Sequence, residues 1–358
     1  TSPPPTPPPP SPPPPSPCFE PVARQGARCD TRWREMAGPG PSLVDPVAAG
    51  GAAARGATAA GWCSLEHVSG GGLSGGPSSE ALADTGWQSA LRGCAASLAG
   101  LTGGAPPPAS GLLLEAMPAL MRLVASRDAE ARALSCLGLA HVAEAGRPLA
   151  VAMAASGCAA RLAHCLEYGG AEAEALALRA LAALLSGSCE SARAVLDSGL
   201  ARLLPPLLER PSAATRGEAC GAVASLAAGA PSRVEWLMGT PLVSLVVQRL
   251  AVDEFGVKRQ ALGVVANVLQ AFQADPRPST AGWAAALVYE HGAVSPLVAL
   301  LDLHDADVLR VALDASGGVL AAGEQLARSS RGGVCSNPFT LPFAEALGGS
   351  PRLPSAPL

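Results

Sequence analysis

The chain has 358 residues, of which 49% are hydrophobic but only 3% aromatic, and its formal net charge is −4. Strands favour β-branched and aromatic side chains, so a composition of small aliphatic residues favours helices over a sheet-rich core. Charged residues make up 15%, and without clustered lysines and arginines this composition argues against a nucleic-acid partner.

Residues 1–78 begin with proline blocks and continue as Gly-, Ala- and Ser-rich sequence. Proline fixes φ and donates no hydrogen bond, so the first 17 residues favour polyproline II. They suit a PxxP ligand for SH3-, WW- or profilin-type modules, or equally a spacer or a hydroxyproline-rich wall-type segment. The rest has too few large apolar side chains to offset the entropy of ordering. We therefore expect disorder over 1–78.

Two motif matches fall in this glycine-rich segment. Residues 72–76 fit the nucleophile pattern GxSxG, and residues 70–75 fit the phosphate-binding pattern GxGxxG. Both motifs work only between a strand and a helix, and the sequence predicts neither neighbour here. We expect no catalytic residues and no enzymatic activity.

The ten cysteines include no CxxC pair and no histidines at zinc-ligand spacing. We expect free thiols in a reducing compartment, no metal site and no cofactor. No stretch of about 20 uncharged apolar residues predicts a membrane span, so no membrane partner is expected.

From about residue 79 the sequence becomes an Ala- and Leu-rich helical pattern with an internal repeat. Blocks of one type begin at residues 135, 177, 219 and 261, each 42 residues after the last. The turns before them keep this spacing and carry small or acidic residues that suit a helix start. These residues are Asp128, Gly170, Ser212 and Glu254. A second apolar run opens at Gly157 and again at Gly199.

A fifth unit follows an insertion around 275–282, and a degenerate unit at 93–99 precedes the array. A helical period of this length predicts a solenoid in which each repeat buries its apolar face against its neighbours. We predict an all-α fold, an armadillo-type right-handed α-solenoid forming a superhelix of five to six repeats over 79–328. We expect 329–358 to be a disordered tail with a truncated final repeat.

Four blocks in the C-terminal half resemble the importin α (karyopherin α) family, in order and at matching spacing across roughly 200–349. They are Glu218–Gly229, Lys258–Asn267, Val311–Gln325 and Asn337–Gly349. Over 80–199 the resemblance is only to armadillo repeats in general. The family resemblance implies an adaptor that binds the basic segments of nuclear localisation signals for protein import into the nucleus. It also implies importin β and nuclear pore components as further partners, and a location in the cytoplasm and nucleus.

That family holds its cargo with a column of Trp and a column of Asn residues, four apart on successive third helices, along a concave groove. Here the Asn column is His141, Ala183, Ser225, Asn267 and Gly318, and the Trp column is Leu137, Arg179, Gly221, Gly263 and Asp314. The position three before the Trp column is acidic in the family, and here it is Glu218 and then Gln260. The resemblance thus implies a peptide-binding groove at Asn267, Ser225, Glu218, His141, Gln260, Gly221 and Gly263.

Alternatives stay open at these positions. Asn267 is either a clamp on a peptide backbone or a general feature of armadillo third helices, and Ser225 either donates to a peptide or permits close helix packing. His141 is either a groove donor or a locally paired side chain, and Glu218 either meets a cargo cation or is solvated. One Asn survives, no Trp does, and no basic N-terminal segment is present, which indicates a diverged or truncated member. The alternative function is an armadillo scaffold for protein–protein interaction without import activity.

Overall fold

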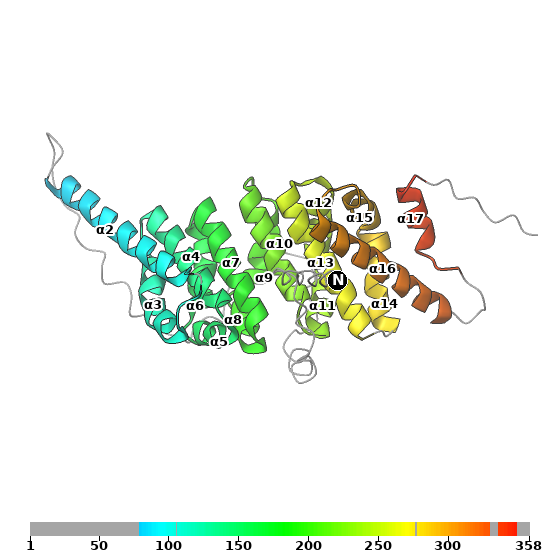
Figure 1. The fold of residues 1–358 in the computed structure, drawn as a ribbon, viewed down its shortest axis with the longest axis horizontal. Coiled ribbons are helices and arrows are strands. Elements are labelled where there is room, and N and C mark those ends of the chain that lie inside the picture. The colour runs from blue at the N-terminus through cyan, green and yellow to red at the C-terminus, as the bar shows by residue number, and fades with distance from the viewer. Residues whose placement is uncertain (1–78, 105, 276–277, 330–335, 349–358) are drawn as a thin grey trace, which may run out of the picture.

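The computed structural model describes residues 79–104, 106–275, 278–329 and 336–348 (Figure 1). Residues 1–78, with their predicted disorder and glycine motifs, lie outside these ranges. The described residues form helices and no strands, so the prediction of an all-α chain is confirmed.

Three-helix units follow one another along the chain. They are α5 (Arg147–Ala155), α6 (Cys158–Tyr168) and α7 (Ala171–Gly187); α8 (Cys189–Asp197), α9 (Leu200–Leu208) and α10 (Ala213–Ala227); α11 (Pro231–Met238), α12 (Leu242–Val252) and α13 (Phe255–Ala274); and α14 (Pro278–Ala285) with the π-helix η2 (Ala286–Glu290), α15 (Val294–Leu300) and α16 (Ala306–Ser329). Before them lie α2 (Ser79–Thr102), α3 (Ser110–Leu123) and α4 (Ala129–Glu144), and after them lies α17 (Thr340–Ala346).

The predicted helix starts are the N-caps of the last helix of each unit. The Asp128 carboxylate accepts a hydrogen bond from the Ala131 amide at 2.8 Å, and the Ser212 hydroxyl accepts one from Thr215 at 3.3 Å. These bonds satisfy backbone donors that the first helical turn leaves without a partner. The 42-residue spacing of the caps therefore sets the spacing of the helices.

Gly157 and Gly199 connect the first and second helices of two units. Each has a positive φ, 75° and 88°, in the left-handed region. A side chain with a Cβ rarely adopts this conformation, so glycine is the residue that permits the tight turn. Both are the N-caps of the second helices that the sequence predicted to begin there.

The last helices of the units, α4, α7, α10, α13 and α16, lie side by side along the long axis of the molecule, with α2 at one end (Figure 1). We call these six helices the third helices. One position of the repeat shows the common core: Cys136, Leu178, Cys220 and Leu262 are all 0% exposed. A single hydrophobic core runs from α3 to α17. The stack of third helices agrees with the predicted solenoid, because each unit covers the apolar face of the next.

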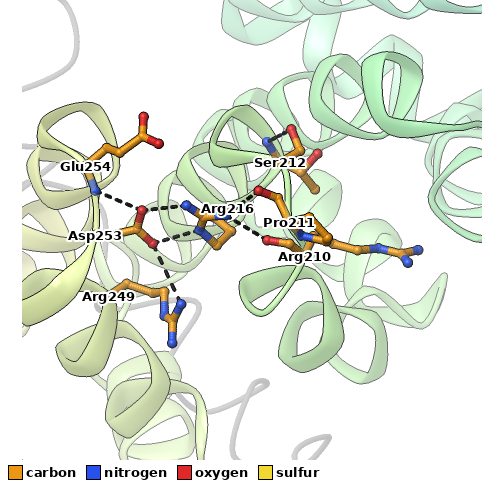
Figure 2. A network of polar contacts seen from close by, with 8 residues as sticks. Arg210, Pro211, Ser212, Arg216, Arg249, Asp253 and Glu254 are labelled. Atoms are coloured by element: carbon orange, nitrogen blue, oxygen red, sulfur yellow. Dashed lines mark hydrogen bonds and ion pairs between the residues drawn. The ribbon is translucent and has the colours of Figure 1, made fainter.

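An ion pair joins α10 to the loop before α13 (Figure 2). The Arg216 guanidinium donates two hydrogen bonds of 2.7 Å to the Asp253 carboxylate, and its Nη1 donates to the carbonyls of Arg210 and Pro211 at 2.8 and 2.7 Å. Arg249 approaches the same carboxylate at 3.8 Å. The Asp253 side chain is 3% exposed. This network therefore ties two successive units together in a partly dry environment.

The same kind of contact recurs at the earlier junctions. It joins Arg92 to Asp128 at 2.7 Å, Arg132 to the carbonyl of Gly169 at 3.1 Å, and Arg210 to Glu174 at 3.0 Å. In each case a side chain near the start or middle of a third helix reaches a residue 36 or 37 positions away. The repeat thus spaces polar contacts between units as well as apolar ones.

Helix α17 lies in the range for which the sequence predicted a disordered tail, so that prediction is wrong for residues 336–348. Phe339 is 0% exposed and Phe343 is 8% exposed. The Asn337 amide donates to the carbonyl of Leu320 on α16 at 2.7 Å, and the Tyr289 hydroxyl donates to that of Pro338 at 3.0 Å. Two buried aromatic rings offset the entropy of ordering this short segment.

No single described helix is long and apolar enough to cross a membrane. Helices α5 and α6 reach that length and hydropathy only as a pair, across a bend of 78°.

Candidate functional site

The third helices carry the residues that the family resemblance implied. His141 is on α4; Glu218, Gly221 and Ser225 are on α10; Gln260, Gly263 and Asn267 are on α13. Helices α10 and α13 are in contact. The structure therefore places six of these seven residues at one junction and leaves His141 two helices away.

A pocket of about 270 Å³ lies between α10 and α13. It is lined by Ala213, Ala214, Gly217 and Glu218 from α10, and by Glu254, Gly256, Val257 and Gln260 from α13 and its N-cap. Only Glu218 and Gln260 among these were predicted as site residues. Glu254 was predicted solely as a helix start. The signal that would have found the others is their shared place in the first turns of two consecutive third helices.

Glu218 is a partly buried acidic residue of this pocket. Its side chain is partly buried, and burial raises its pKa, with the nearby Glu144 adding to the rise and the nearby Arg179 opposing it. Its carboxylate makes no hydrogen bond or ion pair within the described part of the chain. A carboxylate that is partly withdrawn from water and has no hydrogen-bonded counter-charge is costly, and groups with perturbed pKa values cluster at functional sites.

The two glycines of the Trp column leave the surface beside the pocket open. A Cβ on Gly221 would lie 3.5 Å from the Gln260 Oε1, and one on Gly263 would lie 3.7 Å from the Ala224 Cβ. Both distances are ordinary van der Waals contacts. No close packing of the fold requires glycine at these positions.

The Asn column links neighbouring third helices. The Asn267 amide donates to the carbonyl of Ala224 on α10 at 2.9 Å, and the His141 Nδ1 lies 3.3 Å from the carbonyl of Ala99 on α2. Both side chains thus reach the preceding third helix from equivalent positions. Asn267 has a second N–H and a carbonyl oxygen with which to meet a peptide.

Arg179 occupies the Trp column on α7 and was not predicted as a site residue. Its Nε and Nη2 donate to the two carboxylate oxygens of Glu144 on α4, at 2.6 and 2.9 Å. The two side chains are 40% and 39% exposed. This two-pronged geometry is the strong form of an ion pair, and it fills the column where the resemblance would have a Trp.

A second hollow, of about 330 Å³, lies between the second helices α6 and α9 and contains no predicted site residue. It is lined by Leu166, Glu167, Tyr168, Leu203, Pro206, Leu207 and Arg210. Its cation, Arg210, already pairs with Glu174. We therefore place the candidate site at the α10–α13 pocket, where the Glu218 carboxylate makes no ion pair with any residue in the described ranges.

Within the described ranges no group of three or more His, Cys, Asp or Glu side chains could hold a metal ion.

No family model and no curated protein matches this chain. Solved structures do. A designed armadillo repeat protein matches at 22% identity and a TM-score of 0.55, covering 68% of this chain and 95% of its own. A second, crystallised in complex with the peptide (KR)4, matches at 22% identity and a TM-score of 0.55, covering 66% and 94%. Computationally designed armadillo repeat proteins for modular peptide recognition match at 22% identity and a TM-score of 0.54, covering 68% and 94%.

These likenesses establish the fold: the chain is an armadillo-type α-solenoid, as the repeat predicted. At such low identity they speak to the fold alone.

Proposed function

We propose that this chain is an armadillo scaffold that binds an extended peptide with basic residues along its third helices. We propose further that it acts as an importin-α-like adaptor, which takes nuclear localisation signal cargo into the nucleus. The observation that carries the proposal is the partly buried Glu218 carboxylate, which lines a pocket between two third helices and makes no hydrogen bond or ion pair within the described residues.

A cationic side chain of a peptide would complement the acidic charge of this pocket. A guanidinium or ammonium group would neutralise Glu218 and lie near the second carboxylate, Glu254, while Gln260 offers both a donor and an acceptor. A hydrogen bond to a charged group contributes about 1.5–3 kcal/mol. The side chain would enter from an extended peptide whose backbone Asn267 and Ser225 can meet.

Two further arguments favour a basic peptide. The matching designed protein in complex with (KR)4 is an armadillo scaffold with an alternating Lys and Arg peptide. The ordered blocks from Glu218 to Gly349 resemble importin α. From that resemblance we propose importin β and nuclear pore components as partners, and the cytoplasm and nucleus as the location.

A peptide titration tests the binding step. A fluorescent peptide with one Arg-Arg pair in a Gly/Ser context should bind saturably at low salt, and the same peptide with both arginines changed to Ser should not. Glu218→Gln should weaken binding about 10- to 100-fold, because it removes one charge-assisted contact. Glu324→Gln, at an exposed glutamate of α16, is the matched control and should change nothing.

Absence of saturable binding would remove peptide recognition from the proposal. If Glu218→Gln leaves peptide binding unchanged, the peptide binds at a site other than the α10–α13 pocket. Import is tested separately, by accumulation of a basic-signal cargo in nuclei of permeabilised cells supplied with this chain and importin β. Peptide binding without nuclear accumulation of the cargo would support the scaffold function and overturn the adaptor function.

The loss of the Trp column favours a second candidate, a scaffold for a partner that is not basic. Gly221 and Gly263 cannot supply the cation–π contacts, about 0.5–2 kcal/mol each, that a Trp would give. Gly221→Trp distinguishes the two functions. If the basic peptide binds only to this variant, the natural groove serves another partner; if it binds to both, the basic-peptide function stands.

A further inference from the structure

We propose that Arg179 is a specificity-determining residue, whose guanidinium acts as a built-in occupant of the third-helix face and confines a cationic peptide to the α10–α13 pocket. This inference rests on the proposed function. As a consequence, the chain binds one basic cluster of a peptide, although the row of third helices is long enough to bind two.

The contact itself is the first support. Arg179 reaches from α7 to α4 and engages both oxygens of Glu144, which is how an arginine from a bound peptide would engage that carboxylate. The pair is partly exposed on both sides. Glu144 therefore lies where a peptide could reach it and is already neutralised by the chain's own cation.

The position of Arg179 is the second support. Arg179 lies in the column that a binding groove would line with Trp, between Glu144 on α4 and Glu218 on α10, and its charge acts on Glu218 as well. A second peptide cation approaching this part of the face would find the Glu144 carboxylate already paired with Arg179. The α10–α13 pocket, two junctions further along, has no such cation among its lining residues.

Helix spacing sets the peptide that tests this. Helices pack about 8–10 Å apart, so the α4–α7 and α10–α13 junctions lie about 16–20 Å apart. An extended chain rises about 3.3 Å per residue, so about six residues span that distance. The probes are a peptide with one Arg-Arg pair and a peptide with two Arg-Arg pairs separated by six Gly/Ser residues.

The wild-type chain should bind the two peptides within about two-fold of each other, the statistical advantage of a second cluster. Arg179→Ala should strengthen binding of the two-cluster peptide about five- to ten-fold, since a second charge-assisted contact then adds to the first. It should leave the one-cluster peptide within about two-fold. The double variant Arg179→Ala with Glu144→Gln should lose the gain, because the freed carboxylate is gone.

Arg193→Ala is the matched control. Arg193 is a similarly exposed arginine, 46% against 40% for Arg179, and it pairs with Asp197 on the first helix α8. Its loss changes the net charge by the same amount. It should strengthen binding of neither peptide, and circular dichroism should show every variant folded.

A two-cluster affinity that Arg179→Ala does not raise, or raises equally in Arg193→Ala, would overturn this inference while the proposed function stands. A wild-type chain that already binds the two-cluster peptide more than ten-fold tighter would overturn it as well. If no variant binds either peptide, both proposals fall.

Discussion

At the scale of single residues, the chain keeps a carboxylate in a position that costs stability. Glu218 is partly withdrawn from water, and this burial raises its pKa, with the charge of Arg179 opposing the rise and that of Glu144 adding to it. Its neighbours on the Trp column are glycines that no packing contact requires. Residues that a fold does not need, and that reduce its stability, point to a role in binding.

Glu218→Gln should stabilise the protein near neutral pH. The folded state holds the Glu218 proton more tightly than the unfolded state, so stability falls as the pH rises from the ordinary glutamate pKa, about 4.3, through the raised value. Gln cannot ionise and escapes this loss. Thermal unfolding from pH 4 to 7 should give the variant a higher melting temperature than the wild type. The difference should be largest at pH 7 and decrease toward pH 4. A less stable variant at pH 7 would mean that the carboxylate has a stabilising partner.

Gly263→Ala should also stabilise the fold, by about 0.5–1 kcal/mol, because alanine is the better residue inside a helix. Its Cβ would meet the Ala224 Cβ at an ordinary 3.7 Å. Gly138→Ala is the contrasting variant, since that Cβ would lie 2.8 Å from a Leu120 methyl and 3.5 Å from the Ala99 Cα. Urea unfolding should show the gain at Gly263 and none at Gly138. A loss at Gly263 would show that the open surface there is not free space.

At the scale of elements, polar contacts between units supplement the apolar core. The Arg216–Asp253 pair links α10 to the start of α13 with side chains only 13% and 3% exposed. Arg216 also satisfies two backbone carbonyls. Removing one partner of such a little-exposed, two-pronged pair leaves the other charge uncompensated, which costs more than breaking an exposed pair.

Asp253→Asn should destabilise the protein by about 2–4 kcal/mol, since it leaves the Arg216 guanidinium without its counter-charge in a partly buried place. Arg216 lowers the pKa of Asp253. The carboxylate therefore contributes stability above about pH 4, and this contribution is lost as the pH falls through the lowered pKa. The variant should lack this acid-side loss. Chemical unfolding from pH 3 to 7 measures both effects.

The comparison pair is Glu324–Arg328, a one-turn contact with side chains 58% and 79% exposed. Glu324→Gln should change stability by less than about 0.5 kcal/mol. Equal losses at Asp253 and Glu324 would contradict the role assigned to burial.

At the scale of the whole molecule, each unit packs mainly against its neighbours, so stability is distributed along the solenoid. The C-terminal end is held by few elements, with α17 fixed through Phe339, Phe343 and the bond from Asn337 to α16. Lys258, the equivalent of Arg216 on α13, makes no junction ion pair in the described part of the chain. This end should therefore open before the centre does.

Phe339→Ala should release α17 without unfolding the rest. The ring is fully buried beside Tyr289, and removing such a ring costs about 3–5 kcal/mol, more than a short terminal helix can lose and stay docked. Hydrogen exchange should show α17 amides unprotected while α7, α10 and α13 keep their protection. Leu347→Ala, at a residue 66% exposed, should leave α17 protected. Loss of protection throughout the chain would mean that the solenoid unfolds as one unit.

The sequence by itself determined the repeat and the helices. Caps such as Asp128 and Ser212 and the left-handed glycines act within one or two turns, so their spacing could be read directly. The period aligned Glu218 with Gln260, and the structure places both at one pocket. Because α17 is held by rings that find partners far along the chain, local composition alone predicted disorder there instead.

The tertiary structure alone decided what surrounds each aligned position. Glu254 and Gly256 line the pocket because the first turn of α13 packs against α10. Aligning equivalent positions of the repeats does not reveal which residues of two neighbouring helices meet. The pairing of Arg179 with Glu144 crosses a junction between helices and depends on side-chain reach. The repeat period determines which residues share a helix face. Long polar side chains, however, reach partners several turns away or on another helix. Which of them form ion pairs determines which charges remain to bind a ligand.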